Sequence, residues 1–270
     1  MTIGIIGFGN MGSAIAERIK KDYRVLVFDK DASKTGDLSN LELAGSAAEL
    51  AGMADAVILA VKPQDMEMLL EEIKPGVKDK LIISIAAGTK ASYIENILNC
   101  SRVVRAMPNL PAVIGEGFSG LYKGKSANES DLDITRQLLR FIGLSADIAD
   151  EKMMDAVTAV SGSGPAFFCY CVKTSVNDAA GVDKFIEELT LAAAGIGFDR
   201  VLAQRLSEKT VKGTVSLLKA RNWTCPELIK KVASKGGTTE AGLKVLESGG
   251  SVADAVKAAF KRAQELSGGG

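Results

Sequence analysis

The chain has 270 residues, 47% of them hydrophobic, so it can bury a large core and is long enough for two domains of ordinary size. Basic and acidic residues number 33 each, and this balance disfavours nucleic acid and acidic membrane surfaces as partners. Histidine is absent, which excludes Ser-His-Asp catalysis and histidine-assisted hydride transfer.

A short apolar strand, 3–6, leads directly into a glycine-rich turn with the spacing G-x-G-x-x-G. In this motif Gly7 permits the tight turn, Gly9 lets the backbone approach a pyrophosphate, and Gly12 allows the following helix to pack on the strand. The helix that follows then directs its N-terminus at the phosphate charge. We therefore expect a dinucleotide site at this turn, formed by Gly7, Phe8, Gly9, Asn10, Met11 and Gly12.

The second strand, 24–28, ends at Asp29, about 20 residues beyond the glycine motif. A carboxylate in this place accepts hydrogen bonds from the ribose hydroxyls of adenosine and repels a 2′-phosphate, which favours NADH over NADPH. The alternative is that Asp29 only caps the turn that follows it, since aspartate often begins turns. The basic residue Lys30 leaves binding of NADPH possible, so NADH and NADPH are both candidate cofactors.

Three further apolar runs, 56–61, 81–85 and 102–106, each end in a loop of small residues. In an open α/β sheet a ligand binds beyond the carboxyl ends of the strands, so these loops are expected to border the nicotinamide half of the cofactor. Ordinary tight strand-to-helix connections explain the same small residues equally well. The residues predicted here to bind the cofactor are Ala60, Val61, Lys62, Pro63, Ala87, Gly88, Met107, Pro108 and Asn109.

The runs 117–122 and 144–148 predict two additional strands around a helix that begins near Glu129. From about residue 150 the chain changes to long alanine-rich helical stretches with little strand signal. The predicted fold is therefore an α/β Rossmann-type doubly wound sheet in residues 1–150, followed by an all-α domain in residues 151–270.

The first polar segment of the helical half is the glycine-rich turn 160–167. Pro165 is expected near the first turn of a new helix, where its fixed φ is favourable. The two glycines of this turn also permit close approach by the nicotinamide or the substrate.

The second polar segment, 232–243, places a helix N-terminus with unpaired amides beside several hydroxyls. Such a site suits a small carboxylate. The alternative is that a threonine here is simply an N-cap preceded by turn glycines. The residues in question are Ser234, Gly236, Gly237, Thr238 and Thr239.

The four cysteines lack the paired C-x-x-C spacing of a zinc site or a redox motif, so we expect no metal and reduced, mostly buried thiols. They are Cys100, Cys169, Cys171 and Cys225. The chain enters its first strand without a charged leader, and no apolar run approaches the ~20 residues that a bilayer requires. These features predict a cytoplasmic protein without a membrane partner.

Six motifs occur in one order over nearly the whole chain, and together they resemble the pyrroline-5-carboxylate reductase family. They are the segments 7–12, 61–63, 86–89, 107–109, 161–166 and 236–239. The resemblance implies the final step of proline synthesis, in which NAD(P)H reduces 1-pyrroline-5-carboxylate to L-proline. It also implies that the helical domain serves for dimerisation and substrate binding, and that dimers assemble into larger rings. The substrate is then expected between the cofactor and the glycine-threonine loop of the dimer partner.

On the same resemblance, Thr239 is the catalytic residue and hydrogen-bonds near the ring nitrogen of the substrate. The loop residues Ser234, Gly236, Gly237 and Thr238 are implied to hold the substrate carboxylate. Lys235 and Glu240 stand where the family usually has proline and an apolar residue, so the stiffness and charge of the loop are expected to differ. The missing histidine agrees with this chemistry, because a protonated cyclic imine is already activated and needs no strong protein acid.

Two other functions stay open. One is a reductase of the same architecture that acts on a different compound, such as a six-membered imine or a β-hydroxy acid. A β-hydroxy acid requires a helix lysine near the reacting carbon, and the glycine-rich motif that matches such a lysine is not found around any lysine of this sequence. The other function is a nucleotide-sensing protein without turnover, which only Lys235 and Glu240 favour.

Overall fold

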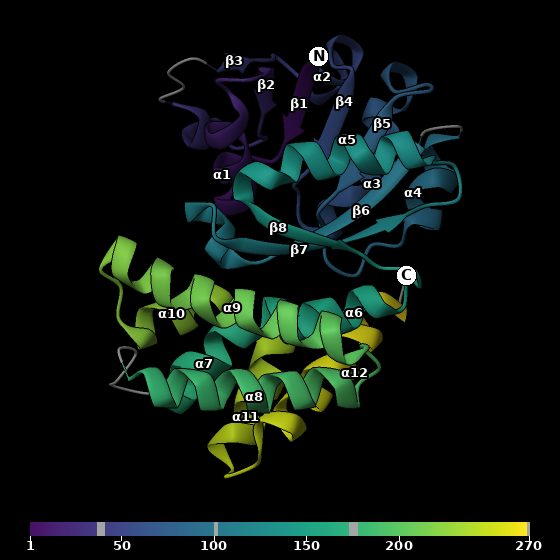
Figure 1. The fold of residues 1–270 in the computed structure, drawn as a ribbon. Helices are drawn as coiled ribbons and strands as arrows, with labels where there is room; N and C mark the ends of the chain where they lie inside the picture. The colour runs from purple at the N-terminus through teal and green to yellow at the C-terminus, as the bar shows by residue number, and fades with distance from the viewer. Residues whose placement is uncertain (37–40, 100–101, 173–177, 269–270) are drawn as a thin grey trace. The chain divides into compact units, whose positions relative to one another are not determined.

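The computed structural model describes residues 1–36, 41–99, 102–172 and 178–268 (Figure 1). The chain divides into two compact units. Unit 1 consists of Met1–Ala106 and Leu121–Ala149, and unit 2 consists of Met107–Gly120 and Asp150–Gly270. The short segment Met107–Gly120 thus belongs with the helical part of the chain, and the domain limits 1–150 and 151–270 stay a prediction.

The described residues form an eight-stranded open sheet with the order β3-β2-β1-β4-β5-β6-β7-β8. The pairs from β3 to β6 are parallel. The predicted doubly wound architecture is confirmed. The strands are β1 (Thr2–Ile6), β2 (Arg24–Phe28), β3 (Glu42–Leu43), β4 (Ala56–Leu59), β5 (Leu81–Ser84), β6 (Arg102–Pro108), β7 (Gly117–Lys123) and β8 (Gly143–Asp147).

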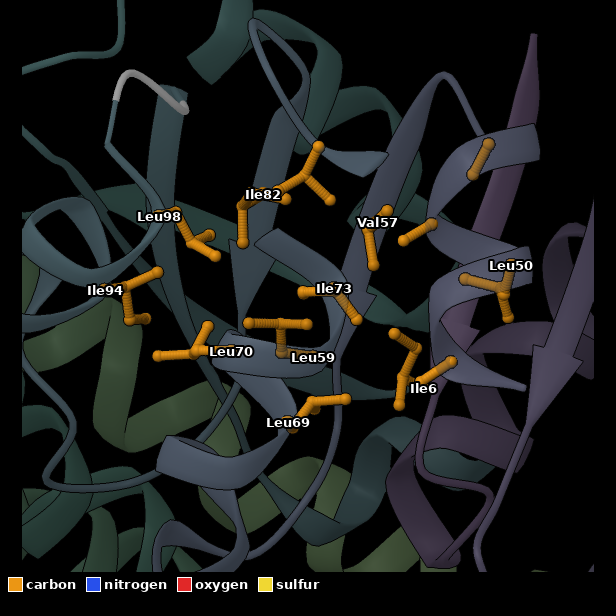
Figure 2. Close-up of a cluster of buried hydrophobic side chains, with 14 of the residues drawn as sticks. Ile6, Leu50, Val57, Leu59, Leu69, Leu70, Ile73, Ile82, Ile94 and Leu98 are labelled. Carbon is orange, nitrogen blue, oxygen red and sulfur yellow. The ribbon is translucent and has the colours of Figure 1, made fainter. Parts of the chain in front are cut away.

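The central strands are buried on both faces, which is why their sequences are continuously apolar. Side chains of β1, β4 and β5 meet those of α2, α3 and α4 in one hydrophobic cluster (Figure 2). The strand β3 was not predicted, because two exposed residues at a sheet edge carry no apolar alternation. The helices of unit 1 are α1 (Asn10–Ile19), α2 (Ala47–Met53), α3 (Met66–Ile73), α4 (Ala91–Leu98) and α5 (Glu129–Leu139), with short 3₁₀ turns η1 (Ala32–Thr35), η2 (Pro63–Asp65), η3 (Lys74–Gly76) and η5 (Arg140–Ile142).

Unit 2 is helical in its described residues, as predicted, apart from the ends of β6 and β7. Its helix starts carry clear signals, such as the Asp199 cap of α9 and the capping box of Thr224 and Glu227 on α10. The helices α8 and α9 pack on each other, as do α11 and α12 (Figure 1). The elements are η4 (Leu110–Ile114), α6 (Met153–Val157), the π-helix η6 (Thr158–Gly162), α7 (Gly164–Val172), α8 (Ala179–Gly195), α9 (Arg200–Arg221), α10 (Cys225–Val232), α11 (Thr238–Glu247) and α12 (Val252–Gly268).

Three cysteines lie in the described part of the chain, and all three are free thiols. Cys169 and Cys225 are buried, whereas Cys171 is exposed; Cys100 lies outside the described residues. Burial, with a smaller contribution from the neighbouring Cys225, raises the pKa of the Cys169 thiol, so this cysteine stays protonated at neutral pH. In the described ranges, no helix is both long and apolar enough to cross a membrane.

Candidate active site

The glycine turn between β1 and α1 holds its shape through two glycines and leaves space at the third. Gly7 has a φ of +98°, and a Cβ atom on Gly12 would lie 1.9 Å from the Gly7 carbonyl oxygen. Both positions therefore require glycine for the fold itself. A Cβ atom on Gly9 would meet nothing within 4 Å, and its φ of −76° suits any residue. The fold itself therefore does not require glycine at this position, which agrees with the predicted approach of a ligand to the backbone.

Helix α1 begins directly after Gly9, which is its N-cap. No side chain caps this helix, and no acidic residue lies in its first turn. The N-terminal amides of Asn10, Met11 and Gly12 are consequently available to an anion, and the helix dipole favours one. Together with the space at Gly9, this arrangement fits the pyrophosphate of a dinucleotide.

A cavity of about 410 Å³ lies in unit 1 beside this turn. It borders the carboxyl ends of β1, β2 and β4, where the strand order changes direction between β1 and β4. Such a switch point is where open α/β sheets bind ligands. The cavity is lined by Ile6, Gly7, Gly9, Phe28, Asp29, Lys30, Lys34, Ala60, Val61, Lys62, Gln64, Asp65, Met68, Leu69 and Glu72.

Most of the predicted cofactor residues of unit 1 lie at this cavity or next to it. Gly7, Gly9, Asp29, Lys30, Ala60, Val61 and Lys62 line it directly. Phe8, Asn10, Met11 and Gly12 belong to the adjoining turn and the first turn of α1, and Pro63 begins η2. Ala87 and Gly88 follow β5 at the carboxyl edge and are not among the lining residues.

Asp29 is held by three donors in the structure. Its carboxylate accepts the amide of Phe8 at 2.7 Å, the amide of Asp31 at 2.9 Å and the ammonium group of Lys34 at 3.1 Å. Burial alone would raise the pKa of Asp29, but hydrogen bonds from the Asp31 and Phe8 amides and from Lys34 outweigh it and lower the pKa. The carboxylate therefore caps the following turn through the Asp31 amide, and it also stabilises the glycine turn through the Phe8 amide. Lys34 lies within hydrogen-bond distance of both carboxylate oxygens, at 3.1 and 3.2 Å, so a ribose hydroxyl must compete with Lys34 for a lone-pair position.

In unit 2, the second polar segment forms the loop that leads into α11. Gly237 is the N-cap of this helix, so Thr238 and Thr239 occupy its first two positions and neither threonine is an N-cap. Gly236 has a φ of +70°, and a Cβ atom on Gly237 would lie 2.3 Å from the Ser234 hydroxyl oxygen. The two glycines are thus required by the turn, which leaves the first amides of α11 without a side-chain cap.

Glu240 changes the charge of this loop. Its carboxylate accepts a hydrogen bond from the Gly236 amide and pairs with Lys244 at 3.2 Å. The Gly236 hydrogen bond, followed by Lys244, lowers the pKa of Glu240, so this side chain is ionised at neutral pH. The guanidinium of Arg262 donates to the Gly236 carbonyl at 2.7 Å and adds a positive charge beside it. The Gly236 amide is therefore engaged within the loop, whereas the amides of Thr238 and Thr239 point outward from the helix end.

The hydroxyl of Thr239 does not face solvent freely, because this residue is only 4% exposed. It donates to the Ser163 hydroxyl at 3.0 Å, and the Thr238 hydroxyl lies 3.1 Å from the same Ser163 oxygen. Ser163 is fully buried at the junction of the π-helix η6 and α7. The two polar segments predicted in the helical half thus meet at one cluster of hydroxyls.

The segment Met107–Asn109 reaches the same region of unit 2. The Asn109 side-chain amide donates to the Ser161 carbonyl at 3.3 Å and accepts from the Phe118 amide at 2.9 Å. The terminal methyl of Met107 lies against Gly162, where it would be 3.7 Å from an added Cβ atom. Three segments that the sequence analysis singled out are therefore in contact within unit 2. Asn109 is buried, and the nitrogen and the oxygen of its side-chain amide both have partners within unit 2. Its direct role in cofactor binding stays a prediction.

Two residues at these sites were not predicted. Lys34 lies five residues beyond Asp29, and nothing in the local pattern marks it as the partner of that carboxylate. Ser163 was noted only as part of a glycine-rich turn. Its signal was a serine that directly precedes the apolar helix 164–172, since a polar side chain that becomes buried there requires a partner.

Comparisons with known proteins cover nearly the whole chain. The sequence profile described as pyrroline-5-carboxylate reductase dimerisation matches residues 151–266, and one described as NADP oxidoreductase, coenzyme F420-dependent, matches residues 2–88. A pyrroline-5-carboxylate reductase of Pseudomonas aeruginosa is 33% identical over 98% of this chain and 96% of that protein. Two solved structures are also similar. The pyrroline-5-carboxylate reductase of Coxiella burnetii has a TM-score of 0.65 and 31% identity over 98% of both chains. The pyrroline carboxylate reductase of Plasmodium falciparum, solved with NADP bound, has a TM-score of 0.64 and 30% identity over 99% of this chain and 98% of that one.

Proposed function

Because the chain belongs to the pyrroline-5-carboxylate reductase family, we propose that it reduces 1-pyrroline-5-carboxylate to L-proline with NADH or NADPH. The family resemblance predicted from the six motifs is confirmed. The observation that carries the proposal is the contact, within unit 2, of the loop before α11 with the Ser161–Ser163 turn and the Met107–Asn109 segment. This cluster offers hydroxyls and helix amides for a small carboxylate heterocycle.

The cofactor is held by unit 1. The uncapped start of α1 and the open space at Gly9 receive the pyrophosphate, while the cavity beside Asp29 and Lys30 takes the adenosine ribose. When bound, the reduced nicotinamide supplies a hydride to the carbon of the C=N bond, and the ring nitrogen keeps its proton and takes the π electrons. The presence of Lys30 and Lys34 at the cavity supports binding of either cofactor.

The substrate carboxylate is assigned to the start of α11. The amides of Thr238 and Thr239 and the hydroxyl of Ser234, which lies against Gly237, are the donors. The amide of Gly236 takes part only if Glu240 releases it. The loop therefore offers fewer free amides to a carboxylate than the sequence indicated, and Lys244 and Lys235 offset the charge of Glu240.

Thr239 is the residue that we place at the ring nitrogen. No strong protein acid is required, because a protonated imine already carries the proton that the product amine needs. The contribution of the protein is orientation, which fixes the imine carbon and the ring nitrogen relative to Thr239. A chain without histidine can supply all of these interactions.

The assembly and location of the protein are also part of the proposal. The match of residues 151–266 to a dimerisation domain supports a homodimer, with the substrate contacted by the loop of the partner subunit. We expect dimers to associate into a ring, and the mass of the particle in solution tests both steps. A cytoplasmic location is expected as well, and cell fractionation tests it.

Replacing Thr239 with alanine is expected to lower turnover of 1-pyrroline-5-carboxylate at least about tenfold, with little change in cofactor affinity, because only the contact to the ring nitrogen is lost. Oxidation of NADH and NADPH is followed with 1-pyrroline-5-carboxylate, with a piperideine carboxylate and without substrate. Thr239→Ser keeps the hydroxyl and serves as the matched control. Faster turnover of the six-membered imine would change the assigned substrate. Cofactor binding without oxidation of any imine would indicate a nucleotide sensor instead.

A further inference from the structure

Ser163 lies between the predicted catalytic hydroxyl and a backbone carbonyl. Its Oγ is 3.0 Å from the Thr239 hydroxyl, 3.1 Å from the Thr238 hydroxyl and 3.5 Å from the Thr158 carbonyl oxygen. Ser163 is fully buried, and Thr239 is nearly so. Polar contacts in such surroundings are stronger than in water, and each buried hydroxyl needs a partner.

The directions of these three hydrogen bonds follow from the number of protons. A serine hydroxyl has one proton to donate and two lone pairs that accept. The Thr158 carbonyl can only accept, so the long contact at 3.5 Å takes the Ser163 proton. Both threonine hydroxyls must then donate to Ser163. This is the one assignment that satisfies all three contacts.

Resting on the reductase function proposed above, we infer that Ser163 is a positioning residue that takes the Thr239 proton and leaves the Thr239 oxygen as an acceptor. Among the described residues, no other donor reaches that oxygen in the structure. The protonated ring nitrogen of the imine is a donor and cannot accept. An oxygen held in this way therefore binds the reactive, protonated form of the substrate and not the neutral form.

The local sequence explains why the hydroxyl of Ser163 is fixed. The π-helix η6 inserts a wider turn before α7, a feature that is frequent at functional sites. Gly164 follows, and a Cβ atom there would lie 3.0 Å from the Thr210 methyl, so α7 packs closely on α9. The position of Ser163 is thus set by the backbone of η6 and α7, on either side of it. It does not depend on the conformation of the loop that carries Thr239.

The test is a double-mutant cycle between Ser163 and Thr239, with Ser163→Ala, Thr239→Ala and the double variant. Ser163→Ala is expected to lower kcat for the imine about fivefold to tenfold, because one orienting hydrogen bond is lost, while the cofactor Kd changes little. The Tm is expected to fall by several degrees, because the buried Thr239 hydroxyl loses its partner. In the Thr239→Ala background, the same replacement is expected to have no further effect on kcat. Ser207→Ala is the matched control, since this serine on α9 is equally buried in unit 2 but its hydroxyl has no hydrogen-bond partner among the described residues.

The outcomes separate the inference from the proposed function. If wild type and Ser207→Ala reduce the imine, but Ser163→Ala lowers kcat equally with and without Thr239, then Ser163 does not act through Thr239 and the inference is overturned. Full activity of Ser163→Ala overturns it as well. If the wild-type protein shows no imine-dependent oxidation of either cofactor, the proposed function fails. That failure rests on the wild-type protein alone and does not depend on the Ser163 variants.

Discussion

Replacing Gly9 with alanine is expected to weaken binding of NADH and NADPH at least about tenfold without loss of stability, a change of about 1.4 kcal/mol in binding free energy. The reason is that the fold leaves space at this position, with no atom within 4 Å of an added Cβ and an ordinary φ of −76°. Alanine at a compatible backbone position usually stabilises a protein by about 0.4–1 kcal/mol. Only a ligand that must approach the backbone would meet the new methyl group. Fluorescence titration with each cofactor and thermal unfolding measure the two effects separately.

Two further glycines provide the controls. Gly52 lies in α2 and is exposed, again with nothing near an added Cβ atom, so Gly52→Ala is expected to leave cofactor affinity unchanged. At Gly12 the added atom would lie 1.9 Å from the Gly7 carbonyl oxygen, and Gly12→Ala is expected to lower the Tm markedly. Unchanged cofactor binding in a stable Gly9→Ala protein would mean that the pyrophosphate does not approach this turn.

The fold was predictable because its signals are local. A buried parallel strand is a continuous apolar run, and this pattern located β1, β2, β4, β5 and β6 to within a few residues. The same is true of the glycine turn, where spacing, strand and helix are contiguous in the sequence. The edge strand β3 was missed because its two exposed residues have no such pattern.

The site was only partly predictable because its hydrogen bonds join distant residues. Ser163 and Thr239 are 76 positions apart, and no local pattern states that their hydroxyls meet. For the same reason the sequence could not show that Glu240 engages the Gly236 amide, although its place in the loop was noticed. Residue type identified the candidate groups, and the packing of α7 against α11 decides which of them donate and which accept.

Replacing Asp29 with serine is expected to shift the ratio of NADPH to NADH affinity at least about tenfold toward NADPH. The carboxylate is nearly buried and faces the cavity, where it repels a 2′-phosphate and also neutralises Lys34. Serine removes the repulsion, frees the Lys34 ammonium for the phosphate, and can still accept from the Asp31 amide. The affinity ratio is the quantity to measure, because loss of the Phe8 hydrogen bond weakens both cofactors alike.

Lys34→Met is the complementary change, and it is expected to shift the same ratio toward NADH, because Asp29 then has no counter-ion and more capacity for the ribose hydroxyls. In the double variant the gain toward NADPH should largely disappear, since that gain needs the freed ammonium group. Lys30 is paired with Asp65 at 2.6 Å, so Lys30→Met tests whether any lysine at the cavity has the same effect. An unaltered ratio in Asp29→Ser would mean that this carboxylate only caps its turn and fastens the glycine turn, and that cofactor preference is decided elsewhere in the cavity.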